Sequence, residues 1–134
     1  SRHMDCVFEP PEHDVLVRAN EGLLQEALVN IIDNAIAYAP RKSVISIRLF
    51  VEGKQAVIEV MDEGPGMTEE EISHAGSRFR RGSTKRSGDG SGLGLAIALT
   101  VARASGGMME VRNRSDRSGL VVRIVLPVLN VSSV

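Results

Sequence analysis

Residues 22–38, GLLQEALVNIIDNAIAY, are the stretch that decides the fold. Apolar residues recur in it at every third or fourth position, which predicts one amphipathic helix that Pro40 ends. The predicted apolar face consists of Leu23, Leu24, Ala27, Leu28, Ile31, Ile32, Ala35 and Ile36. Glu26, Asn30 and Asn34, spaced by four, form a separate polar stripe along the same helix. One side of the helix therefore suits a core, and another suits solvent or a ligand.

The segments around this helix predict one mixed sheet with further helices. The predicted strands are 15–17, 43–52, 55–61, 108–113 and 120–126. Gly53-Lys54 predicts a tight hairpin turn, and Thr68 with Glu71 predicts a capping box for a short helix over 69–75. A second long helix is predicted over 93–104, before Gly106-Gly107. This order is typical of an α+β sandwich with helices on one face of the sheet.

The composition is that of one globular domain. The chain has 134 residues, and its 16 basic side chains nearly balance its 17 acidic ones. This balance gives no general attraction to nucleic acid, and no apolar run approaches the roughly 20 residues of a membrane span. The single Cys6 excludes an intrachain disulfide and a cysteine metal cluster. Residues 1–4, Ser-Arg-His-Met, are interpreted as a cloning scar, which leaves 5–134 as the domain.

The polar stripe of the 22–38 helix is a candidate metal site. A lone asparagine on a helix favours a solvated face, which is the alternative explanation here. Two asparagines one turn apart, Asn30 and Asn34, favour a ligand because carboxamide oxygens are neutral, hard ligands for Mg²⁺. That ion keeps most of its waters and takes few protein oxygens beside phosphates. The stripe therefore predicts a magnesium site next to a phosphate-bearing molecule.

A second candidate site follows the 55–61 strand. Asp62 ends this apolar run, and Gly64 and Gly66 come shortly after it. A carboxylate only accepts hydrogen bonds, so it can bind the exocyclic amine of adenine and would repel the oxygen of guanine at that position. The glycines let the backbone approach a flat base closely. An ordinary Asp-Gly turn is the alternative.

Two further segments suit phosphate. Residues 90–95, GSGLGL, put glycines at the start of a helix, where unpaired backbone amides and the helix dipole attract phosphate. The segment lacks the lysine of a P-loop and the spacing of the dinucleotide fingerprint. Residues 76–90 are rich in Gly, Ser, Arg and Lys and predict a mobile loop. Within it, Arg81 is the favoured phosphate-binding cation and Phe79 an apolar anchor, although a solvated basic loop is the simpler explanation for each arginine.

In this order the segments resemble the catalytic ATP-binding domain of sensor histidine kinases, in the Bergerat-fold superfamily of gyrase, heat-shock chaperones, these kinases and mismatch-repair proteins. Residues 24–40 resemble the N box, 62–66 the first glycine box, 78–82 the F box and 90–95 the second glycine box. The resemblance covers residues 15–127. It implies a two-layer α+β sandwich with a mixed, mostly antiparallel sheet, three main helices on one face and a mobile ATP lid.

The resemblance also implies roles for individual residues. Asn34 would ligate Mg²⁺, Asn30 would support the metal and phosphate site, and Asp62 would bind adenine with Gly64 and Gly66 beside the base. From their own positions, and not from the resemblance, Glu26, one turn before Asn30, would polarise the incoming histidine ring, and Arg81, two residues after Phe79, would meet the phosphates. The resemblance also puts Gly92 and Gly94 at the lid hinge, and Gly94 and Leu95 near the phosphates. Phe79, Gly90 and Leu93 are further candidate nucleotide-binding residues in the same segments.

Several positions depart from the family pattern. Relatives that hydrolyse ATP place a glutamate one turn before the metal asparagine, where this chain has Asn30, whose amide cannot act as a base. Ala37 replaces a frequent basic residue, and Gly76 and Arg80 replace aromatic residues of the F box. The acceptor histidine is absent, because none of the three histidines lies in an H box: His3, His13 and His74.

The sequence therefore predicts the catalytic domain of a bacterial two-component sensor kinase. It would bind ATP with Mg²⁺ and donate the γ-phosphate to a histidine on a separate dimerisation domain of the same parent, for transfer to a response regulator. We expect the isolated domain to be a cytoplasmic monomer that cannot phosphorylate itself, and its parent to be an inner-membrane protein. The alternatives are an ATPase or serine-directed kinase of the same superfamily, and a non-catalytic module in which nucleotide only orders the lid.

Overall fold

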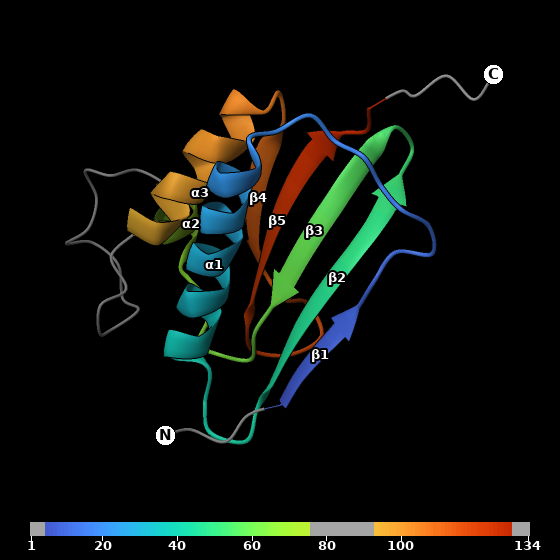
Figure 1. The fold of residues 1–134 in the computed structure, drawn as a ribbon. Helices are drawn as coiled ribbons and strands as arrows, with labels where there is room; N and C mark the ends of the chain where they lie inside the picture. Colours follow the sequence, from blue (N-terminus) through green and yellow to red (C-terminus); the bar gives the residue numbers. More distant parts are fainter. Residues whose placement is uncertain (1–4, 76–92, 130–134) are drawn as a thin grey trace.

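The computed structural model describes residues 5–75 and 93–129, which form a sheet covered by helices on one face (Figure 1). The elements are β1 (Asp5–Glu9), α1 (Glu21–Tyr38), β2 (Val44–Glu52), β3 (Gln55–Met61), α2 (Glu69–Ser73), α3 (Leu93–Ala104), β4 (Met108–Asn113) and β5 (Leu120–Pro127). The strand order is β1-β2-β3-β5-β4, with β1 parallel to β2 and every other neighbouring pair antiparallel. This confirms the predicted α+β sandwich and its mixed, mostly antiparallel sheet.

Helix α1 begins and ends where local sequence signals require. The side-chain oxygen of Asn20 accepts a hydrogen bond from the backbone N–H of Leu23 at 3.0 Å and so caps the first turn. Pro40 follows the C-cap and cannot continue the helix. Leu23 and Ile36, two residues of the predicted apolar face, are 46% and 42% exposed and do not join the core. At 100° per residue they lie on the two margins of the apolar face.

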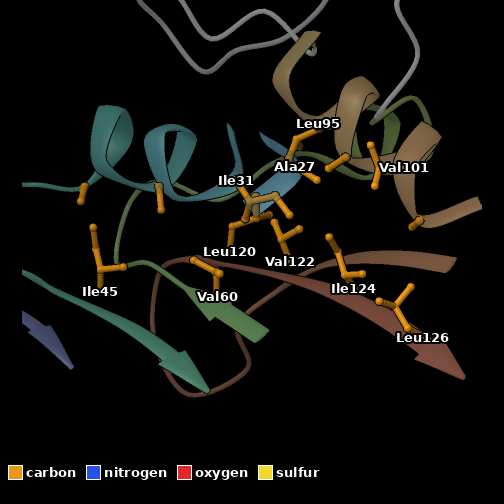
Figure 2. Close-up of a cluster of buried hydrophobic side chains, with 14 residues drawn as sticks. Ala27, Ile31, Ile45, Val60, Leu95, Val101, Leu120, Val122, Ile124 and Leu126 are labelled. Carbon is orange, nitrogen blue, oxygen red and sulfur yellow. The ribbon is translucent and has the colours of Figure 1, made fainter. Parts of the chain in front are cut away.

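The core lies between the sheet and the helices α1 and α3 (Figure 2). Ile31 of α1 and Leu95 of α3 are almost fully buried, as are Leu120 and Ile124 of β5. Burying a side chain of this size stabilises the fold by about 1.5–3 kcal/mol. Alanines at fully buried positions of both helices let them lie close together: Ala27, Ala98 and Ala102. Within the described residues, no helix is long and apolar enough to cross a membrane.

One predicted strand was wrong, and one strand was missed. Residues 15–17 form no strand; Val17 makes only an isolated bridge to Val128. The strand beside β2 is instead β1, whose five residues are all exposed. An exposed edge strand has no hydrophobic alternation to reveal it, and its parallel partner is reached only after the whole of α1.

The predicted capping box and the predicted hairpin turn are both present in the structure. Thr68 Oγ1 accepts from the Glu71 backbone N–H at 3.1 Å, and Glu71 Oε1 accepts from the Thr68 N–H at 2.8 Å, which is the predicted capping box. Helix α2 itself ends two residues earlier than predicted, at Ser73. Gly53 makes the β2–β3 turn with a φ of 63°. The predicted mobile loop, 76–90, lies outside the described residues.

The sheet face opposite the helices carries a row of alternating charges across the strands. The charge row consists of Glu9, Arg48, Glu59, Arg123 and Glu110, which are direct neighbours in register on β1, β2, β3, β5 and β4. The carboxylate of Glu59 is 3% exposed and contacts Arg48 at 3.3 Å and Arg123 at 2.9 Å. Both guanidinium groups also lie over the Phe50 ring, 4.6 Å and 5.6 Å from its centroid. On this face, the side chains of the charge row and of Phe50 therefore pack on one another across the strands.

Candidate nucleotide-binding site

Chain connectivity brings three of the predicted motifs to one end of the molecule (Figure 1). Helix α1 leads through residues 39–43 into β2, and β2 pairs antiparallel with β3, so α1 and β3 end on the same side. Helix α3 runs away from that side, because its C-terminal end leads into Met108 of β4, which pairs with Val125 near the far end of β5. The polar stripe of α1, the segment after β3 and the start of α3 therefore surround a common end.

Asp62 directly follows β3, and its carboxylate is buried at 2% exposure. Its Oδ1 accepts hydrogen bonds from the backbone N–H of Gly64 at 2.8 Å and of Leu120 at 3.2 Å. The backbone of Asp62 also donates to the Leu120 carbonyl at 3.1 Å. A carboxylate held by backbone donors on two segments has a fixed position and orientation. The structure thus places an oriented acceptor at the end of this strand, and its predicted binding of adenine stays a prediction.

The glycines after Asp62 stand where side chains would collide. Gly66 has a φ of 73°, and a Cβ there would lie 2.5 Å from Oδ1 of Asn113. Gly119, on the turn between β4 and β5, has a φ of 149° and approaches the carbonyl oxygen of Asp62 so closely that a Cβ would lie 2.1 Å from it. Only glycine combines these backbone angles with such close contact. The segment 62–67 and the β4–β5 turn are therefore two closely fitted loops.

Sequence reasoning missed the β4–β5 turn as part of the site. Four of its side chains contact the segment after β3: Asn113, Arg114, Arg117 and Ser118. Ser118 Oγ, for example, donates to the carbonyl of Gly64 at 2.6 Å. The only sequence signal was a cluster of polar residues between two strands, which is typical of any turn. Its position beside Asp62 follows from the pairing of β3 with β5, which the chain pattern does not reveal.

Glu63 connects this segment to two other elements. Its Oε1 accepts from the backbone N–H of Val44 at 3.0 Å, and its Oε2 contacts Arg117 at 2.8 Å. The Val44 N–H first, and then the Arg117 guanidinium, lower the pKa of the Glu63 carboxyl from its ordinary value of 4.5. The same contact with Glu63 raises the pKa of Arg117. Glu63 therefore stays ionised at neutral pH and holds the segment to the start of β2.

The polar stripe of α1 is present as predicted, but its members differ in environment. Asn30 and Asn34 are half-buried, whereas Glu26 is exposed. The side-chain nitrogen of Asn30 donates to the carbonyl of Glu26 at 2.9 Å. This bond leaves the amide of Asn30 with its oxygen as the acceptor for any ligand.

The residues expected to bind phosphate are only partly described. Leu95 is 1% exposed and belongs to the core, so any contact with a ligand would come from its backbone. Leu93 and Gly94 form the first turn of α3. The other predicted contacts lie outside the described residues: Phe79, Arg81, Gly90 and Gly92.

The described donor groups fit Mg²⁺ bound together with phosphates. Among residues 5–75 and 93–129, no group of three or more His, Cys, Asp or Glu side chains could hold a metal ion by itself. Two neutral carboxamide groups, those of Asn30 and Asn34, lie on one face of α1. Mg²⁺ that is bound with a nucleotide needs no more than one or two such oxygens. The Asp62 carboxylate, in turn, fits the amino group of a purine.

Comparisons with known proteins agree with this geometry. The family described as histidine kinase-, DNA gyrase B- and HSP90-like ATPase matches residues 19–130. The sensor protein KdpD of Clostridium acetobutylicum is 32% identical over 119 residues, which cover 87% of this chain and 13% of that protein. The solved structure of the mycobacterial sensor histidine kinase MprB has a TM-score of 0.79 and 29% identity, over 93% of this chain and 82% of that one.

A further solved structure contains a partner. The histidine kinase ThkA in complex with the response regulator protein TrrA has a TM-score of 0.75 and 25% identity, over 92% of this chain and 34% of that one. Among the curated relatives, the chain spans only a small part of the whole protein, for example 13% of KdpD. The family match, the shared fold and the buried aspartate after β3 lead to one conclusion. The chain belongs to the histidine kinase-, DNA gyrase B- and HSP90-like ATPase family, in the branch of sensor histidine kinase catalytic domains.

Proposed function

We propose that this domain binds ATP together with Mg²⁺ and donates the γ-phosphate to a histidine on a separate dimerisation domain. The observation that carries the proposal is the buried Asp62 carboxylate, oriented by two backbone N–H groups inside a chain of the ATPase family. Asp62 would accept a hydrogen bond from the adenine amine, while Gly64 and Gly66 leave room for the ring. Guanine would place an oxygen against the carboxylate and bind more weakly.

The triphosphate would extend from this base site toward α1 and the start of α3. Asn34, supported by Asn30, would provide carboxamide oxygens for Mg²⁺, which when bound neutralises phosphate charge. The backbone of Leu93, Gly94 and Leu95 would contribute N–H groups at the helix start. The remaining phosphate and lid contacts are proposed for residues outside the described part: Phe79, Arg81, Gly90 and Gly92.

Asn30 favours transfer to histidine over hydrolysis. Its amide cannot take a proton from water at neutral pH, so the site lacks a base at the position where ATP-hydrolysing relatives have one. A histidine nitrogen brought to the γ-phosphorus would form the new P–N bond as the bond to the ADP oxygen breaks. The exposed Glu26, one turn before Asn30, would orient that histidine ring.

The domain would act as one part of a longer sensor kinase. We infer that residues 5–134 are its catalytic unit, with residues 1–4 a cloning remnant, and that the dimerisation and sensor domains belong to an inner-membrane parent. The small share of the KdpD sensor protein that aligns supports this arrangement. The ThkA kinase is solved in complex with a response regulator, which supports onward transfer to such a protein.

Calorimetric titration with ATP, GTP and ADP, each with and without Mg²⁺, tests base and metal binding together. We expect ATP and ADP to bind and GTP to bind at least about tenfold more weakly. Asp62→Asn should remove this preference, because an amide presents a donor as well as an acceptor. Equal binding of ATP and GTP by the unchanged domain would exclude the adenine role of Asp62.

Transfer requires an acceptor, so the second assay adds the dimerisation domain of a sensor kinase. Labelled phosphate from ATP should reach its histidine, and Asn34→Ala should abolish transfer while part of the adenine affinity remains. Steady ATP turnover by the domain alone would instead indicate an ATPase module. Nucleotide binding that Mg²⁺ does not change, with no transfer to the acceptor, would indicate a non-catalytic module.

A further inference from the structure

The segment that carries Asp62 is held from outside by the turn between β4 and β5. This turn lies about fifty positions later in the chain, yet it contacts the segment repeatedly over residues 62–67. The contacts are directed hydrogen bonds to backbone groups as well as ion pairs. Such a support can determine where a recognition group stands, and not only whether the loop is folded.

Asn113, the last residue of β4, makes a two-point contact with Met67. Its Nδ2 donates to the Met67 carbonyl at 2.7 Å, and its Oδ1 accepts from the Met67 N–H at 2.8 Å. The planar amide thereby pairs with one residue's backbone as a neighbouring strand would, which fixes both distance and direction. Gly66, directly before Met67, lies so close to Asn113 that no side chain fits between them.

Arg114 acts on Asp62 itself. Its Nη1 donates to the Asp62 carbonyl at 3.1 Å, while its Nε and Nη2 each donate to one oxygen of Asp116 at 3.0 Å. A planar guanidinium held by a bidentate carboxylate has little freedom to turn. The Arg114 side chain is 9% exposed, so this bond is made largely away from water. Asn113 and Arg114, two adjacent residues at the end of β4, therefore hold the two ends of the 62–67 segment.

We propose that Asn113 and Arg114 are positioning residues for base recognition, which set the location of the Asp62 carboxylate relative to the bound purine. The proposal rests on the proposed function, because it assumes that Asp62 binds adenine. Discrimination between an amine and a carbonyl on a purine depends on the placement of one acceptor to a fraction of an ångström. Without either support, the 62–67 segment would pivot about the hydrogen bonds between Asp62 and Leu120, which keep it folded but do not by themselves define the angle at which the carboxylate meets the purine.

The experiment measures the dissociation constants of ATP, GTP and Mg-tripolyphosphate for the domain and for Asn113→Ala. We expect ATP to bind about tenfold more weakly, with GTP and tripolyphosphate changed less than about twofold, since one positioned hydrogen bond is at stake. The ATP-to-GTP ratio does not depend on the folded fraction, so partial unfolding cannot imitate the effect. Ser115→Ala, in the same turn, is the matched control and should keep the ratio.

Arg114→Ala provides the second variant, with Arg112→Ala as its control, because Arg112 is an exposed arginine two positions earlier. Arg114→Ala should lower the ATP-to-GTP ratio as Asn113→Ala does, and Arg112→Ala should not. If the unchanged domain prefers ATP and both variants retain that preference, or lose all three ligands equally, the positioning role is refuted. If the unchanged domain shows no preference for ATP, the proposed function itself fails.

Discussion

Glu63 is the residue whose charge most directly connects separate parts of the site. Its carboxylate bridges the Val44 N–H and the Arg117 guanidinium, and both lower its pKa from 4.5. A lowered folded-state pKa means that the stabilising contribution is fully present above the unfolded-state pKa and is lost as the pH falls through the folded-state pKa. Acid should therefore loosen the segment beside Asp62.

Glu63→Gln tests this contribution. Glutamine keeps an acceptor for Val44 but loses the charge that Arg117 contacts, so the variant should be less stable than the unchanged domain at about pH 7. The difference should shrink at acidic pH, as the pH falls through the lowered folded-state pKa of Glu63 and the wild-type carboxyl takes up its proton. Urea unfolding at neutral and at acidic pH measures it. A difference that is constant with pH would contradict the assignment.

Gly66 and Gly53 form a matched pair for backbone strain. Both have positive φ, 73° and 63°, but a Cβ on Gly66 would meet Asn113, whereas nothing lies within 4 Å of one on Gly53. We expect Gly53→Ala to cost roughly 1 kcal/mol of unfolding free energy and Gly66→Ala at least about 2 kcal/mol. Thermal unfolding of the two variants gives the comparison. Equal losses would show that Asn113 yields to the added methyl group without cost.

At the residue scale, the sequence shows the candidate recognition residue but not the residues that support it. Asp62 stands out because an acidic residue ends an apolar run, a local signal that needs no knowledge of the fold. Asn113 and Arg114 contact that segment from 46 and 52 positions away, so nothing near them in the sequence indicates a role. Strand order alone brings them together.

Elements with local start and stop signals were predicted well. Helix α1 shows this best, because the apolar repeat and Pro40 lie within one stretch. Strand β1 was missed because its pairing partner lies beyond α1, and exposed residues leave no periodicity. Residues 15–17 have the composition of a strand but form no ladder, only an isolated bridge from Val17 to Val128 and a hydrogen bond from the Leu129 N–H to the Leu16 carbonyl. Long-range pairing, not propensity, decided between the two segments.

The cap of α1 gives the prediction at this scale. Asn20→Ala removes the acceptor that satisfies the Leu23 N–H and should lower the unfolding free energy by about 1 kcal/mol. Asn20→Asp is the control, because it keeps the acceptor and adds a charge that the helix N-terminus favours. Urea titration should rank wild type and Asn20→Asp together, above Asn20→Ala. If all three proteins unfolded at the same urea concentration, the cap would make no contribution to the unfolding free energy.

At the scale of the whole molecule, the sheet is covered by helices on one face and by its own side chains on the other. Glu59 is central to the second face, because it neutralises Arg48 and Arg123 from a position that is 3% exposed. Glu59→Ala should cost about 2 kcal/mol, since both arginines remain partly solvated and can turn outward. Glu110→Ala, at the exposed end of the charge row, should cost less than about 0.5 kcal/mol. Chemical unfolding measures the unfolding free energy of both variants. A larger decrease for Glu110→Ala than for Glu59→Ala would contradict the role of Glu59.

The charge row also determines which charges lie on the two outermost strands of the sheet. Because acidic and basic residues alternate across an odd number of strands, both outermost strands, β1 and β4, end the row with a glutamate, Glu9 and Glu110. If two copies met edge to edge with these glutamates opposite one another, carboxylate would face carboxylate, whichever edge strands they used. Like charges on edge strands oppose the edge-to-edge strand pairing between molecules that leads to aggregation. The same side chains that shield one face thus discourage self-association at both margins.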